Sequence, residues 1–394
     1  MRNVGTVVRG IRTPIIKEND DLAKIVVDSL MKAKESEGFE FKDRDIVAIT
    51  EAVVGISEGN YITVDDIAKD LQTKFPSKKI GVVFPILSRN RFSLILKGIA
   101  RGMDKITIQL SFPADEVGNG ILDEDLLEKS KYNLSSVITE EQYKETFGSW
   151  LHPFTGINMV DFYRELAKSE NCEVEFVFAN DPKEILKYTK DVLTCDIHTR
   201  LRTKKLLEEA GGHVYGLFEV MNKPIGNSGF NPSYGLLGSN KSTEERLKLF
   251  PKTGDALVAD IQNRLKQKTG KTIEVMVYGD GAFKDPVGHI WELADPVVSP
   301  AFTKGLNGTP NEIKLKYVSD NKFADLRGDE LKEAIKGEIR NKAKDLKGQM
   351  VTQGTTPRRI TDLVGSLCDL TSGSGDKGTP VIYIQGYFDN LADE

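Results

Sequence analysis

The chain has 394 residues, of which 39% are hydrophobic and 29% charged, a composition typical of a globular protein with room for two or more domains. Its formal net charge of −5 at pH 7 argues against a nucleic-acid partner, because a phosphate backbone favours a basic surface. No run approaches the ~20 apolar residues of a transmembrane helix, and the N-terminus lacks a signal peptide's apolar stretch. The few cysteines show no CxxC spacing, which disfavours disulfides and structural zinc. We therefore expect a soluble, cytoplasmic protein that spans no membrane.

The first fifty residues predict a strand, a helix and a second strand. Residues 4–10 are strand-like, and the Asp20-Asp21 pair is typical of a helix N-cap. Apolar residues then recur at helical spacing from Leu22 to Leu30. Residues 46–50 form a short apolar run that predicts a buried strand.

Between residues 75 and 222 strand and helix patterns alternate. Strands are predicted at 80–87, 106–110, 174–179, 192–197 and 214–218, and helices at 92–100, from 182 onward and at 198–210. Such alternation is typical of parallel strands with covering helices. We interpret this stretch as an α/β unit whose middle, about 112–160, is an elaborated loop or cap.

The C-terminal part returns to longer helices and glycine-rich loops. Residues 225–242 predict a loop; the predicted elements that follow are a helix at 255–268, a strand at 272–277, a strongly charged helix at 329–348, a helix at 359–370, a glycine loop at 371–378 and a strand at 381–384.

Five segments, in this order, resemble the coenzyme F420-0:L-glutamate ligase family. Residues 10–22 (GIRTPIIKENDDL) are similar to the family's Gly-Leu-Pro-x-Ile and Gly-Asp-Asp-Leu, and residues 45–59 to its Asp-Val-Leu-Val-Val strand ending in Ser-Lys-x-Glu-Gly. Residues 234–240 resemble its Asn-Ala-Gly-Ile-Asp-x-Ser-Asn loop. Residues 269–280 look like its nucleotide and metal segment, and residues 373–380 like its Gly-x-x-Asp-Gly-x-Pro loop.

The resemblance implies both an architecture and an activity. It implies an α+β, F420-ligase-like domain formed by residues 1–74 and 223–394, with residues 75–222 as an inserted α/β unit. Members of this family join glutamate to a carboxylate through an amide bond, using GTP and Mg²⁺ or Mn²⁺, and pair as homodimers. The resemblance therefore implies an NTP- and metal-dependent γ-glutamyl or related amide ligase acting on an amino acid and a small-molecule carboxylate.

Particular residues inherit roles from this resemblance. Asp280 and Glu58 match acidic positions of the family, and we interpret both as metal ligands, Asp280 because it ends a buried strand between two glycines. The nucleotide is expected at Asn240 and at the last glycine loop, through Gly373, Gly375, Asp376 and Gly378. Each of these positions is equally compatible with an ordinary turn or loop residue. The identity of any catalytic residue stays unknown.

Other positions depart from the family's pattern. Leu237 stands where the family carries an aspartate that binds metal, and Ile56 where it carries a lysine near the nucleotide. The family's Ser-Thr pair is Glu51-Ala52, and Ser374 follows the first glycine of the last loop. Aliphatic side chains bind neither Mg²⁺ nor phosphate. These departures favour an alternative function, in which the protein is a catalytically altered relative that binds a nucleotide or an anionic metabolite without ligation.

Basic residues follow two predicted strands of the inserted unit. Arg89 and Arg91 open one helix, and His198 and Arg200 open another. Open α/β sheets bind anions at such positions, and paired arginines suit carboxylates and phosphates. We interpret these four residues as an anion or substrate site; the alternative is a solvated basic start of each helix.

Overall fold

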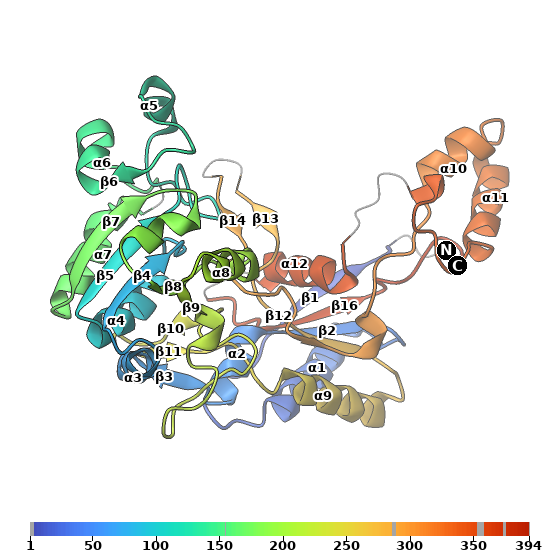
Figure 1. Cartoon of the computed structure of the whole chain (residues 1–394). Coiled ribbons are helices and arrows are strands. Elements are labelled where there is room, and N and C mark those ends of the chain that lie inside the picture. The colour runs from blue at the N-terminus through green and yellow to red at the C-terminus, as the bar shows by residue number, and fades with distance from the viewer. Residues whose placement is uncertain (1–3, 154, 286–288, 353–357, 373–375, 394) are drawn as a thin grey trace.

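The computed structural model describes residues 4–153, 155–285, 289–352, 358–372 and 376–393. Within these ranges the strands form a five-stranded sheet, a six-stranded sheet and two small sheets, and Figure 1 shows the two large sheets side by side with helices on both faces of each. The mixed α/β composition agrees with the predicted fold class. None of the helices in the described ranges combines the length and apolar character needed to cross a bilayer.

The five-stranded sheet joins the two ends of the chain. Its order is β1 (Val7–Ile11), β16 (Val381–Gln385), β2 (Ile46–Thr50), β12 (Glu274–Tyr278) and β15 (Ala301–Phe302). Only β2 and β12 run parallel to each other, and the other neighbours are antiparallel. The carboxyl ends of β2 and β12 therefore lie next to each other at one edge of the sheet.

Helices cover both faces of this sheet. α1 (Leu22–Glu37) and α9 (Gly254–Thr269) pack on one face, and α12 (Ile360–Ser372) packs on the other. Because successive strand residues point to opposite faces, Val47 contributes to the core under α1 and α9 while Ala48 contributes to the core under α12. A sheet buried on both faces explains the continuous apolar runs of its strands.

The six-stranded sheet has a doubly wound order. It runs β6 (Ile138–Thr139), β7 (Glu173–Phe178), β5 (Lys105–Leu110), β4 (Lys79–Val83), β8 (Asp191–Thr194) and β9 (His213–Gly216). All its strands except β6 are parallel, which confirms the predicted parallel arrangement. The chain enters this sheet at β4 in the middle and adds β5, β6 and β7 on one side. It then crosses to add β8 and β9 on the other side, so the direction of winding reverses between β4 and β8.

Helices from one continuous region sandwich this second sheet. α3 (Val64–Lys74), α4 (Phe92–Gly102) and α7 (Met159–Ser169) share its main core. α8 (Arg200–Glu209) and the 3-10 helix η1 (Pro182–Lys187) cover the opposite face. The helix predicted from residue 182 is thus a short 3-10 helix.

Shorter elements complete the chain. They are α2 (Glu51–Ser57), β3 (Tyr61–Thr63), α5 (Glu124–Lys129), α6 (Glu140–Phe147), η2 (Leu217–Glu219), β10 (Asn240–Lys241), β11 (Arg246–Lys248), β13 (Phe283–Lys284), β14 (Trp291–Glu292), η3 (Lys304–Leu306), α10 (Leu315–Lys322), α11 (Gly328–Arg340) and η4 (Met350–Thr352). The helix predicted at 329–348 therefore ends early, at Arg340. Figure 1 shows α10 and α11 projecting away from both sheets.

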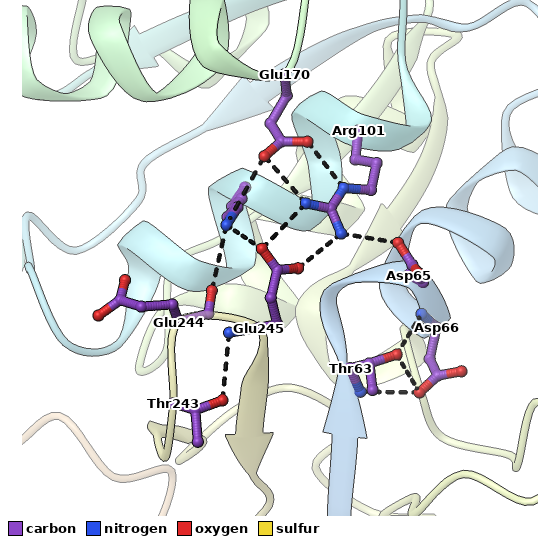
Figure 2. A network of polar contacts seen from close by, with 9 residues as sticks. Thr63, Asp65, Asp66, Arg101, Glu170, Thr243, Glu244 and Glu245 are labelled. Atoms are coloured by element: carbon purple, nitrogen blue, oxygen red, sulfur yellow. Dashed lines mark hydrogen bonds and ion pairs between the residues drawn. The ribbon is translucent and has the colours of Figure 1, made fainter.

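An ion-pair network holds α3, α4, α7 and the β10–β11 hairpin together (Figure 2). Arg101, near the end of α4, binds Glu170 at 2.8 Å, Asp65 at 2.8 Å and Glu245 at 2.7 Å. Networks of this kind stabilise more than isolated surface pairs, so we assign Arg101 a structural role.

Candidate functional site

Two carboxylates lie at the edge where the parallel strands of the five-stranded sheet end. Glu51 directly follows β2, and Asp280 lies two residues beyond the end of β12. Thr50 pairs with Tyr278 in the register of these strands. The parallel register therefore places both acidic residues at one edge.

Arg91 reaches this edge from the six-stranded sheet. It lies between β4 and α4, and its guanidinium donates to Asp280 Oδ2 and to Asp295 Oδ1, both at 2.8 Å. The other oxygen of Asp295 accepts the N–H of Asp280 at 2.8 Å. The side chains of Arg91 and Asp280 are 20% and 25% exposed and that of Asp295 is 1% exposed. One arginine thus joins the strand ends of the two large sheets.

Two further charged contacts complete the site. Asp369 on α12 accepts the N–H of Gly281 at 2.9 Å, and Glu51 forms a buried ion pair with Lys248 at 2.6 Å. We call Glu51, Asp280, Asp295 and Asp369 the acidic cluster. Arg91 and Lys248 supply two positive charges against its four carboxylates, which leaves two negative charges when all groups are ionised.

Burial disfavours the charged state of this cluster. Burial, and next the charge of Asp295, raise the pKa of Asp280 to about 7. Burial also raises the pKa of Glu51, against the opposing effect of Lys248, and that of Asp369. Burial alone would lower the pKa of Arg91, but Asp295 and Asp280 outweigh it and raise that pKa. Arg91 is therefore a permanent cation, while Asp280 gains or loses a proton near neutral pH.

The cluster fits a divalent ion held partly by another ligand. In the described ranges, no group of three or more His, Cys, Asp or Glu side chains is arranged to hold a metal ion by itself, and Arg91 lies between two of the carboxylates. Mg²⁺ commonly uses one or two carboxylates and completes its coordination with water and substrate phosphates. Asp280 and Asp369 fit that requirement, and the two uncompensated negative charges match one divalent cation.

A cation-lined pocket lies at the same end of α12. Its volume is about 910 Å³, and its charged lining consists of Arg9, Arg12, Lys32, Lys377 and one carboxylate, that of Glu37. Thr371, which follows Asp369 by two residues, also lines it. The Nη1 atom of Arg9 is buried and has no hydrogen-bond partner among the described atoms. The pocket therefore carries more positive than negative charge, and its link to the acidic cluster is α12, which contributes Thr371 to the pocket and Asp369 to the cluster.

The predicted nucleotide residues are only partly described. Asn240 lies opposite Lys248 in the β10–β11 pairing, and Lys248 binds Glu51 of the cluster. Gly378 has a left-handed backbone (φ 67°) and its carbonyl accepts the N–H of Thr13 at 3.3 Å, so the first and last resembling segments lie together. Asp376 is exposed beside them. Gly373, Gly375 and the departing residue Ser374 lie outside the described residues.

Glu58 and the two aliphatic departures have local packing roles. The carboxylate of Glu58 accepts the N–H groups of Lys252 and Thr253 at 3.0 and 2.9 Å, just before α9. Ile56 packs against the core under α1 and α9. Leu237 is 2% exposed and packs in the core of the six-stranded sheet. Glu58 is not among the contacts of the acidic cluster, and its prediction as a metal ligand stays a prediction.

Of the four basic residues of the inserted unit, Arg91 alone has a contact to the acidic cluster in the described structure. Arg89 is exposed. His198 Nε2 lies 2.6 Å from the carbonyl oxygen of Leu293, and Arg200 donates to the carbonyl of Ile197. Their role in binding an anion is an untested prediction.

Sequence reasoning missed three members of the site, Lys248, Asp295 and Asp369. Asp369 carried a usable signal, because it is an acidic residue within the apolar stretch Leu367-Cys368-Asp369-Leu370. Asp295 had a weaker signal of the same kind, between Ala294 and Pro296. Lys248 had none.

The comparison with known families agrees with the resemblance of the five segments. The model of the family described as F420-0:Gamma-glutamyl ligase matches residues 10–386, a range that includes residues 75–222. Ligases of this family act on a carboxylate. No curated protein matches the chain.

Proposed function

The chain belongs to the F420-0:gamma-glutamyl ligase family, and from this premise we propose that it is an NTP- and metal-dependent amide ligase. It would add glutamate or a similar amino acid to a carboxylate-bearing small molecule. The observation that carries the proposal is that α12 contributes Asp369 to the acidic cluster and Thr371 to a pocket lined by four cations and one carboxylate.

The pocket suits the nucleotide. Its volume of about 910 Å³ lies within the range of small-molecule sites, and Arg9, Arg12, Lys32 and Lys377 supply the charges that phosphates require. Backbone N–H groups of a glycine loop can also hold phosphate oxygens. The last glycine loop, with Asp376 and Gly378, and Asn240, which pairs with Lys248 in the β10–β11 hairpin, are the further contacts we propose for GTP or another NTP.

Asp280 and Asp369 would hold the divalent ion, Mg²⁺ or Mn²⁺. When bound, such an ion neutralises phosphate charge. Asp295 orients Asp280, because it accepts the N–H of Asp280 and shares Arg91 with it. Lys248 keeps the buried Glu51 compensated.

The reaction has two steps in this proposal. An oxygen of the substrate carboxylate attacks the γ-phosphorus and the nucleoside diphosphate leaves, which gives an acyl phosphate. The amino acid's nitrogen then attacks the acyl carbon, releases phosphate and loses a proton, which leaves the amide. We propose that the two carboxylate-bearing substrates bind at the strand ends of the six-stranded sheet, near Arg89, His198 and Arg200, and that two copies of the chain pair as a homodimer.

A second candidate function rests on Arg91 and Leu237. The ion pair with Asp280 occupies one oxygen of the best metal ligand, and Leu237 adds apolar surface beside Arg91. A relative that binds a nucleotide or anionic metabolite without ligation would tolerate both features. Product formation separates the two candidates.

Thermal melting with nucleotides and metals tests the proposal first. We expect GTP or ATP with Mn²⁺ to raise the midpoint by several degrees and either alone to raise it less, because each ligand completes the site of the other. For Lys32→Ala, roughly tenfold more nucleotide should be needed to produce the same shift in melting midpoint. Lys24→Ala, on the exposed face of the same helix, is the matched control.

Turnover is the second measurement. Purified protein, NTP, Mn²⁺, glutamate and a panel of carboxylates should release nucleoside diphosphate only when both the amino acid and a carboxylate are present. A nucleotide-dependent shift without turnover favours the second candidate. The absence of any shift with any nucleotide would exclude the ligase and leave only the anionic-metabolite form of the second candidate.

A further inference from the structure

Arg91 bridges two carboxylates of the acidic cluster. Its two terminal nitrogens each lie 2.8 Å from a different carboxylate, those of Asp280 and Asp295. Asp295 is almost fully buried, with a side chain 1% exposed. A planar guanidinium with two parallel donors suits such a buried bridge.

The local structure fixes Arg91 in this position. Its N–H donates to Ser88 Oγ at 3.1 Å, and the N–H of Ser88 in turn donates to the hydroxyl of Tyr163 at 2.8 Å. The carbonyl of Asn90 accepts the N–H of Lys241 at 2.8 Å. The helix that follows Arg91, α4, is buried along most of its length. The turn that carries Arg91 is therefore held from three sides.

Apolar side chains close one side of Arg91, while its own side chain is 20% exposed. The cavity it borders, with Phe92 and Leu237 among its walls, has a volume of about 30 Å³, enough for one or two water molecules. That cavity is too small for the guanidinium, and moving the guanidinium into solvent would leave the buried Asp295 and the partly buried Asp280 without a cation. Leaving buried charges uncompensated is strongly unfavourable.

We propose that the guanidinium of Arg91 is a permanent internal cation that fills the position between Asp280 and Asp295, where a divalent ion would otherwise bridge them. The divalent ion of the proposed function then binds only the remaining oxygens of the cluster, so the inference refines that function. It rests on the ion triad itself and not on the reaction.

The charge of the site gives the expected effect of removing Arg91. With Arg91 present the four carboxylates face two cations, and without it they face Lys248 alone. The vacated position would carry the charge and the oxygen ligands that attract Mn²⁺ or Mg²⁺. An Arg91→Ala protein should therefore bind one additional divalent ion per chain.

Manganese titration tests this directly. Free Mn²⁺ is measured by electron paramagnetic resonance as the metal is added to wild type, Arg91→Ala and Arg101→Ala. We expect Arg91→Ala to bind one more Mn²⁺ per chain than wild type, and Mn²⁺ to raise its melting midpoint by about 5 °C or more. Arg101→Ala removes an arginine with a similar number of ion pairs at the other end of α4. Its partners Asp65 and Glu245 are 62% and 51% exposed, so water solvates them and this variant should gain no ion.

Equal Mn²⁺ stoichiometry in wild type and Arg91→Ala overturns the proposal. If Arg91→Ala folds only with Mn²⁺ in the medium, the proposal is supported. If Arg91→Ala is insoluble with and without Mn²⁺, Arg91→Gln replaces it in the experiment, because glutamine keeps more of the side-chain volume. A wild-type Mn²⁺ stoichiometry in Arg91→Gln would then overturn the proposal in the same way. A gained ion in a protein that binds no nucleotide would support the inference while contradicting the proposed function.

Discussion

Asp280 shows how neighbours set the chemistry of a single residue. Burial and the nearby Asp295 raise its pKa to about 7, while Arg91 counteracts part of that rise. Its carboxylate is therefore protonated for much of the time below pH 7 and ionised above it. Cation binding requires the ionised form, so the proposed metal site is sensitive to pH near neutrality.

We predict that Mn²⁺ affinity depends on pH through Asp280. Above pH 7 the affinity should level off, and below pH 7 it should fall about tenfold per pH unit, because each bound ion displaces one proton. Isothermal titration between pH 5.5 and 8.5 measures the slope. Asp280→Asn should lose both the tight binding and the slope, and a variant that keeps the wild-type slope would assign the proton to another group.

At the scale of elements, the sequence predicted most of the strands and longer helices. The strand at 46–50 agrees with β2, and the helix at 255–268 agrees with α9 within one residue at each end. These elements have apolar runs or regular helical spacing, and both signals are local.

α11 ends at Arg340, earlier than the helical pattern of the sequence predicts. The charged sequence continues beyond Arg340, but the backbone after α11 is bound to Asn311, whose amide donates to the carbonyls of Ala343 and Lys344 and accepts the N–H of Leu346. These contacts span more than 30 positions in the sequence. Helical periodicity does not contain that information.

Glu58 gives a prediction at the level of one helix. Its carboxylate accepts two N–H groups at the start of α9 and the hydroxyl of Thr253, an arrangement that stabilises a helix N-terminus by hydrogen bonding and by charge. We expect Glu58→Ala to lower the free energy of unfolding by about 1–2 kcal/mol in urea titrations. Glu58→Gln, which keeps one acceptor oxygen, should lose less.

The same variants decide between the two roles of Glu58. A helix-capping role leaves Mn²⁺ affinity within about twofold of wild type once each protein is fully folded. A loss of tenfold or more in both variants, without a matching loss of stability, would restore Glu58 as a metal ligand.

At the scale of the whole molecule, the candidate site forms where the two sheets meet. The sequence indicated Asp280 and Arg91 separately, each at the end of a strand, but their pairing joins residues 189 positions apart. Asp295 and Asp369 reach the same point from a loop and a helix. Charged residues at the ends of strands can be predicted from a sequence. The relative placement of two sheets cannot, because it depends on packing that no local pattern encodes.

The projecting segment that contains α10 and α11 is peripheral to both sheets. The N–H of Ile360 donates to the carbonyl of Gly308 at 3.0 Å, so the intervening chain leaves and returns at one point. Among the described residues, Val318, Ile335 and Ile339 of its helices are buried but belong to the core of neither sheet.

We predict that replacing residues 310–358 with a short glycine-serine linker preserves the fold. The adjacent ends make loop closure inexpensive in entropy, and both sheet cores remain complete, so the melting midpoint should fall by about 5 °C or less. Circular dichroism and calorimetry measure the midpoint, and Mn²⁺ titration checks that the acidic cluster is retained. Loss of cooperative unfolding would instead make the segment an integral part of the core. If light scattering shows a dimeric full-length chain and a monomeric deletion variant, the segment forms the proposed homodimer contact.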